Sequence, residues 1–243
     1  MTERPPFVLV HGGRHGGWCW KRLSPRLRQA GHEVHVITLT GLGERAHLIR
    51  PDTGLGVHVQ DLVAMMRYED IHDAVIVAHS YGGMVVCGAM EEVGDRVRSL
   101  VFLDAQMPHT GESVFDIIGP ERAVGMTEMA ELDGEGWYIP PSDARTYGVS
   151  DPDDVAWANA RISAQPIASY REPVGLTDRA WACPGTYIEC VPTAMKPHML
   201  ARPRARSQAD SRFRYRTLDA PHDAMITSPH ALCELLLEVV GVA

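Results

Sequence analysis

The chain has 243 residues, 45% of them hydrophobic, and a formal net charge of −8 at neutral pH. This length suffices for one sizeable hydrophobic core, as one domain with a large insertion or as two small domains. The negative charge argues against nucleic acid or an anionic membrane surface as the main partner. No apolar run approaches the roughly 20 residues that a membrane-spanning helix needs.

Strand-like and helix-like stretches alternate along the chain with short links. The strand-like stretches are continuous apolar runs, as expected of strands buried on both faces of a sheet. The predicted strands are 7–12, 33–39, 73–80, 98–105, 185–191 and 212–219, and the predicted helices are 18–30, 57–68, 82–93, 195–209 and 228–240. Strict alternation is typical of right-handed βαβ units. The sequence therefore predicts an α/β fold with a mostly parallel, six-stranded sheet flanked by helices.

The alternation breaks between residues 106 and 183. Prolines and three tryptophans interrupt this stretch, and only short helical patches such as "SVFDIIG" are visible. We interpret residues 106–183 as an inserted helical cap, and residues 1–105 and 184–243 as the core domain. The basic cluster at 202–216 contains an aspartate among its arginines, and we expect it to cover a helix and an edge strand.

The five cysteines are odd in number, scattered, and without CxxC spacing. We expect reduced, mostly buried thiols, and neither a disulfide framework nor a zinc site. The chain passes from "MTERPP" directly into the first strand, without the charged and apolar regions of a signal peptide. These features favour a cytoplasmic protein.

The stretch "VIVAHSYGGMVV" (75–86) places Ser80 between a buried strand and a helix. The carboxyl ends of parallel strands border the crevice in which open α/β sheets bind ligands. A nucleophile on a tight strand-to-helix turn needs small residues two positions before and after it. Ala78 and Gly82 occupy those positions. Serine is also a common helix N-cap, but this combination of features predicts that Ser80 is a nucleophile.

A serine nucleophile needs a base and donors for an oxyanion. His222 lies in "LDAPHDAM", between the last strand and the last helix, at the same edge of the sheet, and we expect it to be the base. Glycines in "HGGRHGGW" (11–18) allow backbone N–H groups to point into a site, so the amides of Gly13 and Tyr81 are the expected oxyanion donors. The histidines expected on surfaces or in loops are His32, His35, His47, His58 and His72.

With these features, the chain resembles the α/β-hydrolase fold. The segments 7–27 and 31–45, the "AHSYGG" turn and the loop of His222 are similar to the branch that contains plant methyl esterases, hydroxynitrile lyases and bacterial esterase relatives. The resemblance implies that Ser80 is the nucleophile and His222 the base, with Gly13 and Tyr81 as oxyanion donors. It also implies a six-stranded sheet without the two leading strands of larger members.

The resemblance implies an aspartate just after the strand at 185–191, but Thr193 stands there. A base needs a carboxylate to fix its tautomer and to stabilise its protonated form. Asp104, at the end of the preceding strand, is our hypothesis for this carboxylate. Glu189 and Asp219 are alternatives, as is the absence of any acid.

Ester or lactone hydrolysis through an acyl-serine is the leading function, on a small, largely apolar substrate of aromatic or polyketide-like type. A non-hydrolytic acid–base catalyst (lyase, decarboxylase, dehydratase or cyclase) and a small-molecule receptor are the alternatives. Cyanohydrin chemistry is disfavoured, because Asp223 follows His222 and Gly12 follows His11 where the resemblance would imply lysine and threonine.

Small apolar substrates require an apolar pocket, to which the aromatic residues of the cap are suited. The residues expected to bind substrate are Gly12, Met107, Trp137, Tyr138 and Trp157. We expect no metal, no cofactor, and no nucleic-acid or membrane partner. A homodimer is compatible with the sequence, which carries no signal of oligomeric state.

Overall fold

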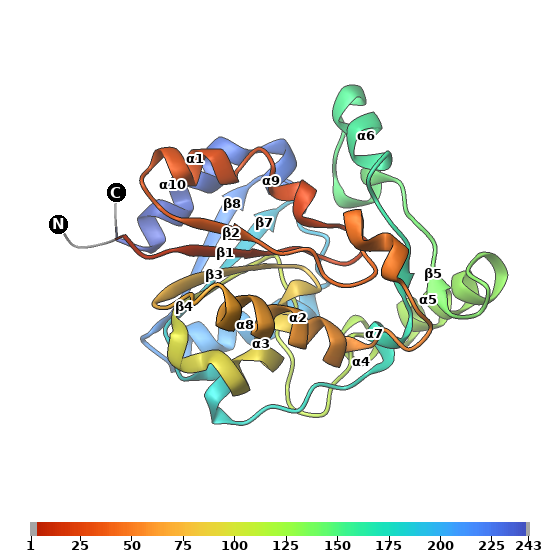
Figure 1. Ribbon diagram of the computed structural model, residues 1–243, viewed down its shortest axis with the longest axis horizontal. Coiled ribbons are helices and arrows are strands. Elements are labelled where there is room, and N and C mark those ends of the chain that lie inside the picture. Colours follow the sequence, from red (N-terminus) through yellow and green to blue (C-terminus); the bar gives the residue numbers. More distant parts are fainter. Residues whose placement is uncertain (1–3, 242–243) are drawn as a thin grey trace.

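The computed structural model describes residues 4–241. Six strands form one parallel sheet, in the spatial order β2-β1-β3-β4-β7-β8 (Figure 1). The strands are β1 (Phe7–Val10), β2 (Val34–Val36), β3 (Ala74–His79), β4 (Val97–Leu103), β7 (Gly185–Val191) and β8 (Phe213–Asp219). The predicted six-stranded α/β sheet is confirmed.

Helices cover both faces of the sheet, because alternate residues of each central strand enter different hydrophobic cores. Phe7 and Leu9 join the core beneath α1 (Ser24–Gln29) and α10 (Pro229–Val239). Val8 and Val10 join the core beneath α2 (Leu55–Tyr68), α3 (Gly82–Val93) and α8 (Pro197–Ala209), on the opposite face (Figure 1). The remaining helices outside 106–183 are η1 (Gly17–Trp20), η2 (Gly43–Leu48), η3 (Gly94–Arg96) and α9 (Ala224–Thr227). Within residues 4–241, none of the helices has the length and apolar content that crossing a bilayer requires.

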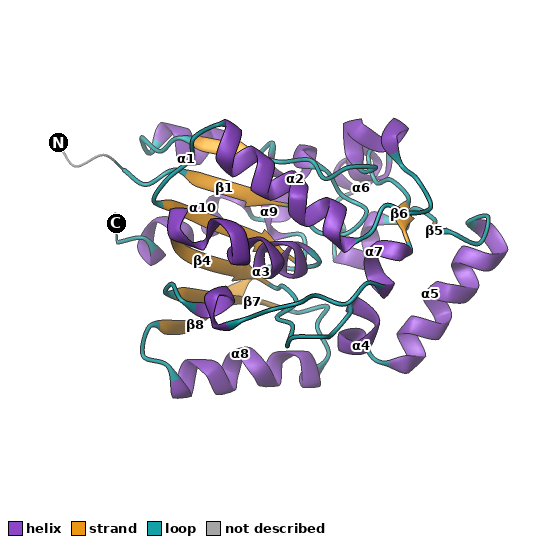
Figure 2. Cartoon of the chain, turned by 60° about the horizontal axis from the view of Figure 1, so that its bottom comes forward, coloured by secondary structure: helices purple, strands orange, loops and turns teal. Residues whose placement is uncertain are grey.

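The segment between β4 and β7 gathers as far as α7 at one end of the sheet, and its last part, with η5, runs back beside α3 (Figure 2). It contains α4 (Val114–Ile118), α5 (Pro120–Asp133), β5 (Tyr138–Ile139), η4 (Ala144–Tyr147), α6 (Pro152–Asn159), β6 (Gln165–Pro166), α7 (Ala168–Arg171) and η5 (Asp178–Trp181). β5 and β6 pair antiparallel. Side chains of this segment enter both hydrophobic cores. The division into core and cap at residues 106 and 183 stays a prediction.

Two elements differ from the sequence expectation. The predicted helix at 18–30 is divided into η1 and α1, with Pro25 in the first turn of α1. The 14-residue helix α5 was not expected, because it has no continuous apolar stripe and buries only Ala130. Hydrophobic periodicity cannot predict a helix that lies mostly in solvent.

The order of the strands creates the crevice in which the site lies. From β1 the chain moves to β2 on one side, and β3 then lies on the other side of β1. The segments that follow β1 and β3 therefore diverge, which leaves an opening at the carboxyl ends of these two strands. The "HGGRHGGW" loop and Ser80 both begin at this opening.

The tight turn after β3 depends on the absence of a side chain at Gly83. A Cβ atom there would lie 2.0 Å from the carbonyl oxygen of Gln106, a backbone group that cannot rotate away. We predict that Gly83→Ala lowers the free energy of unfolding by about 3 kcal/mol or more, because the chain after β4 would have to move. Gly125→Ala is the control: Gly125 lies inside α5 with nothing within 4 Å of its Cβ position, so alanine should stabilise the helix slightly. Urea denaturation of both variants measures the difference, and equal stabilities would contradict this account.

Candidate active site

Ser80 stands on a strained turn between β3 and α3. Its backbone φ is +52°, a left-handed conformation that a residue with a side chain adopts only when the fold imposes it. A Cβ at Gly82 would lie 2.9 Å from the carbonyl oxygens of Val10 and His11, so the small residue there permits the close approach of α3 to β1. This geometry is the strand–turn–helix arrangement that presents a nucleophilic hydroxyl at the end of a sheet.

Asp104 and His222 meet across the sheet although 118 residues separate them in sequence. The Nδ1–H of His222 donates to Asp104 Oδ2 over 2.6 Å, and both side chains are buried. Thr193 Oγ1 donates to the other oxygen of the carboxylate over 2.7 Å, and the Cys190 amide also donates to it. Because Nδ1 carries the proton, Nε2 of His222 is left as a hydrogen-bond acceptor. Thr193, which stands where an aspartate was expected, thus holds the carboxylate of Asp104 in its contact with His222.

The other two candidate acids lie elsewhere. Glu189 accepts hydrogen bonds from Arg204 and from the hydroxyl of Tyr215, at distances of 2.9 and 2.6 Å, and so belongs to an ion pair beneath α8. Asp219 ends β8 with an exposed side chain. Among the described residues, Asp104 is the carboxylate that bonds His222.

His11 fixes the orientation of the loop after β1. The Leu39 amide donates to His11 Nε2 over 3.1 Å, so Nδ1 must be the protonated nitrogen, and it donates to the Gly12 carbonyl over 2.7 Å. The Gly13 N–H belongs to the same planar peptide and points away from that carbonyl. Gly13 lines the cavity beside Ser80, and within residues 4–241 its N–H donates to no other group. Burial lowers the pKa of His11 to about 3, which keeps the ring neutral and this arrangement constant.

Tyr81 places its amide at the start of α3, where helix N–H groups have no partner within the helix. Its side chain is fully buried and its hydroxyl donates to His58 Nδ1 over 2.8 Å. The expectation that His58 lies on the surface or in a loop was wrong, because its ring is buried on α2 and donates to the Thr40 carbonyl. His32 lies in the loop between α1 and β2, as expected, but its ring is buried and bonded to the Pro5 carbonyl. Helical spacing alone does not show that a polar ring has such a partner.

Ser80, His222 and Gly13 line one cavity of about 290 Å³. Its apolar wall comes mainly from four methionines, Met126, Met129, Met195 and Met199. Its polar lining includes Arg14, Gln106, Arg122, Ser142, Tyr147 and Tyr170. These residues were not predicted from the sequence, because they come from five separate segments with no common motif.

The five predicted substrate-binding residues are not in the lining of this cavity. Gly12 lies beside it, since a Cβ there would be 2.9 Å from Ser80 Cβ. Met107 and Trp137 border other hollows of the surface. Trp157 packs edge-on against Trp18, with the guanidinium of Arg161 4.8 Å from its ring centre. Trp137 also contacts Tyr138 edge-on. The role of these five residues in substrate binding stays a prediction, and the ring of Trp157 packs the inserted segment onto Trp18.

A cluster of buried polar groups lies behind His222. His79 donates through Nε2 to the His222 carbonyl, and Asp223 accepts a hydrogen bond of 3.0 Å from His15. Burial alone would lower the pKa of His15, but the Asp223 carboxylate raises it above the ordinary value. His79, His222 and Asp223 offer atoms within 4.8 Å of one another, a spacing that a metal could use. The bonds named above already engage the Nε2 atom of His79, Nδ1 of His222 and one oxygen of Asp223, so these groups act first as supports of the His222 loop.

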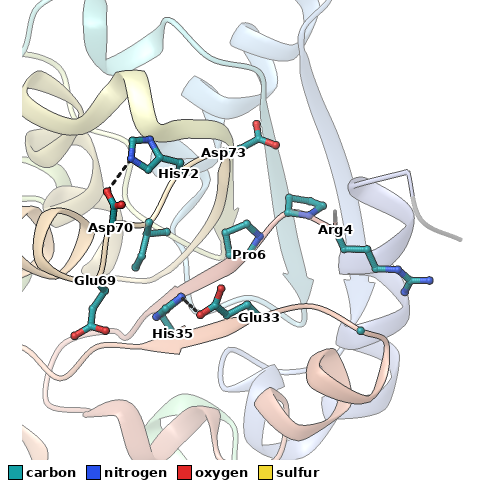
Figure 3. A pocket seen from close by; sticks show the side chains of 11 residues that line it. Arg4, Pro6, Glu33, His35, Glu69, Asp70, His72 and Asp73 are labelled. Carbon is teal, nitrogen blue, oxygen red and sulfur yellow. Dashed lines mark hydrogen bonds and ion pairs between the residues drawn. The ribbon is translucent and has the colours of Figure 1, made fainter. Parts of the chain in front are cut away.

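A second, larger cavity of about 490 Å³ opens at the opposite, amino-terminal edge of the sheet (Figure 3). Its lining is charged, with His72 bonded to Asp70 and His35 paired with Glu33. None of the described residues that line it carries a hydroxyl or a thiol. It therefore lacks a serine, threonine or cysteine nucleophile, and the candidate active site for a serine hydrolase is the smaller cavity, which Ser80 lines.

Comparison with known proteins identifies the family of this chain. The model of the "Alpha/beta hydrolase family" matches residues 7–235. A carbendazim hydrolyzing esterase from Nocardioides sp. (strain SG-4G) is 38% identical over 176 residues, which cover 69% of this chain and 72% of the relative. Methylesterase 10 of Arabidopsis thaliana is 28% identical over 254 residues, covering 97% and 91%. Among solved structures, an extracellular α/β-hydrolase from a Paenibacillus species superposes with a TM-score of 0.86 at 20% identity, covering 97% of this chain and 98% of the other.

The contribution of Asp104 to catalysis can be tested by comparing Asp104→Asn with Asp219→Asn. Asp104→Asn should lower kcat about 10³-fold or more, because the amide cannot hold His222 in the required tautomer. Asp219→Asn should leave the rate of ester hydrolysis within about twofold of the original, since that side chain is exposed and far from His222 in the hydrogen-bond network. Steady-state hydrolysis of 4-nitrophenyl butyrate measures both, and a near-normal rate in Asp104→Asn with collapse in Asp219→Asn would make the assignment wrong.

The neutrality of His11 has a consequence for stability. Its pKa is near 6.5 in the unfolded chain and about 3 in the folded protein, so only the unfolded state gains a proton between these values. The contribution of His11 to the free energy of unfolding is therefore complete above pH 6.5 and is lost as the pH falls toward 3. We predict that His11 contributes about 2 kcal/mol less at pH 5.0 than at pH 7.5.

Urea denaturation of the protein and of His11→Asn at both pH values measures this contribution. The difference between the two pH values should be about 2 kcal/mol smaller in His11→Asn. His72→Asn, which removes an exposed ring, is the control and should leave the difference unchanged. The same pH difference in all three proteins would show that His11 titrates normally in the folded state.

Proposed function

This chain belongs to the α/β hydrolase family and is an esterase-type enzyme of that fold, and on this basis we propose that it hydrolyses small carboxylic esters or lactones through an acyl-serine intermediate on Ser80. The observation that carries the proposal is the Asp104–His222 pair, which lies behind a cavity lined by both His222 and Ser80. Names of the relatives support the ester bond as the target, since they include methylesterases and a carbendazim hydrolyzing esterase.

In the first half-reaction, Ser80 Oγ attacks the carbonyl carbon of the ester, and its proton passes to His222 Nε2. Asp104 stabilises the imidazolium that forms, because its carboxylate already accepts the Nδ1–H. The amides of Gly13 and Tyr81 donate to the oxyanion as the carbonyl oxygen becomes charged. When the tetrahedral intermediate collapses, His222 returns the proton to the leaving alcohol and the acyl group stays on Ser80.

In the second half-reaction, water attacks the acyl-serine while His222 accepts its proton. The carboxylic acid is then released and Ser80 regains its hydrogen from His222. The methionine-lined wall suits a substrate with an apolar body, because thioether side chains adapt to different shapes. A cavity of about 290 Å³ limits the substrate to a small molecule.

Covalent labelling tests the nucleophile. A fluorophosphonate probe should modify Ser80, as located by mass spectrometry of peptides, and Ser80→Ala should lose both labelling and about 10³-fold or more of the hydrolysis of 4-nitrophenyl butyrate. Ser211→Ala, which changes an exposed serine, should retain both. Absence of labelling, together with retained binding of small molecules, would favour a receptor instead.

Isotope incorporation separates hydrolysis from non-hydrolytic chemistry. In water enriched in ¹⁸O, hydrolysis must place the heavy oxygen in the carboxylic acid product, because water completes the second half-reaction. A product acid without the label would contradict the acyl-serine route.

A further inference from the structure

The cavity beside Ser80 contains two arginines and no carboxylate among the described residues that line it. Arg14 follows Gly13 in the loop after β1 and is only 6% exposed. Arg122 reaches the same cavity from α5 and is half-buried. Two positive charges therefore line one small cavity. Arg14 comes from the core and Arg122 from the inserted segment.

The guanidinium of Arg14 is only partly engaged. Its Nη1 donates to Ser142 Oγ over 2.9 Å and to the Tyr147 hydroxyl over 3.2 Å, both neutral acceptors. Its Nε is buried without any hydrogen-bond partner within residues 4–241. Arginine stays protonated in proteins, so this side chain is a buried charge with a free donor.

Other arginines near this cavity are paired with carboxylates. Arg202 forms an ion pair of 2.6 Å with Glu112, and Arg145 forms one of 3.1 Å with Asp143. Within the part of the chain that the structure describes, neither Arg14 nor Arg122 has a carboxylate oxygen within 4.0 Å of its nitrogens. A buried charge without a counter-charge is unfavourable, unless the molecule that occupies the cavity supplies one.

Tyr170 lines the same cavity as the two arginines. Burial raises the pKa of its hydroxyl to about 12, and the positive charges of Arg14 and Arg122 oppose this rise. Because both arginines line one cavity of about 290 Å³, an anionic group bound in it would lie in the field of both guanidinium groups.

We propose that Arg14 and Arg122 form a carboxylate subsite of the active-site cavity, and that the substrate is a monoester of a dicarboxylic acid. The inference rests on the proposed ester hydrolysis at Ser80. The free carboxylate belongs on the acyl part, because this part stays bound through both half-reactions and the same anchor then serves each of them. A guanidinium fork binds a carboxylate with two parallel, charge-assisted hydrogen bonds. The methionine wall contacts the chain between the two carboxyl carbons.

Two chromogenic esters of the same shape test this subsite. Mono-4-nitrophenyl glutarate carries the free carboxylate, and 4-nitrophenyl 5-methylhexanoate carries an isopropyl group in its place. In Arg14→Met, the ratio of kcat/KM for the glutarate ester to kcat/KM for the neutral ester should fall about tenfold or more. Arg122→Met should show the same selective loss to a smaller degree, and within residues 4–241 the Arg122 side chain makes no hydrogen bond that the substitution would remove.

Arg145→Met is the matched control, since it removes one positive charge from the inserted segment outside the cavity. It should leave the ratio of the two kcat/KM values unchanged. An equal loss for both esters in Arg14→Met, with no change of the ratio in Arg122→Met, would mean that Arg14 only ties the inserted segment to the loop, and would overturn the subsite.

A binding measurement separates failure of this inference from failure of the proposed function. Glutaric acid mono-4-nitroanilide, an amide of the same shape, is titrated into the protein by calorimetry, which needs no turnover. A Kd at least about tenfold weaker in Arg14→Met supports the subsite even if no ester is hydrolysed. An unchanged Kd, or no binding to the unaltered protein, overturns the subsite even if Ser80 is confirmed as the nucleophile.

Discussion

The buried carboxylate of Asp104 is the group around which this site is built. It directly follows β4, with a backbone φ of +42°, and it joins His222 from the loop after β8 to Thr193 from the loop after β7. A carboxylate in such a position is stable only because its oxygens accept several hydrogen bonds. Those bonds fix the ring of His222, and the position of His222 relative to Ser80 follows from them.

Buried histidines support this arrangement through their choice of tautomer. His11 accepts from the Leu39 amide and donates to the Gly12 carbonyl, and the direction of the Gly13 N–H follows. His58 donates to the Thr40 carbonyl and accepts from Tyr81. Burial lowers the pKa of both rings, so each keeps one donor and one acceptor at neutral pH. Neutral imidazole is well suited to this task, since it links two backbone or side-chain groups of opposite polarity.

The inserted segment does more than cover the cavity. Gln165, fully buried, accepts a hydrogen bond of 2.8 Å from the Arg14 amide and donates to Ser169. Ser163 donates from its amide to the Arg14 carbonyl. The loop that carries Gly13 is thus held by residues 163–169 of the inserted segment and by His11 of the core. The direction of the Gly13 N–H therefore depends on both the inserted segment and the core.

The sequence by itself determined the sheet, the turn at Ser80, the glycine loop and the candidacy of His222. Each of these depends on a local pattern: continuous apolar runs, small residues at fixed spacing, or a polar residue just after a strand. The choice of Asp104 over Glu189 and Asp219 was open in the sequence. Only the tertiary structure decided which of the three carboxylates bonds His222, because this contact depends on the spatial order of β4, β7 and β8. The lining of the cavity, including Arg14 and Arg122, was likewise decided by packing, because residues brought together from eight separate segments leave no periodic signal in the chain.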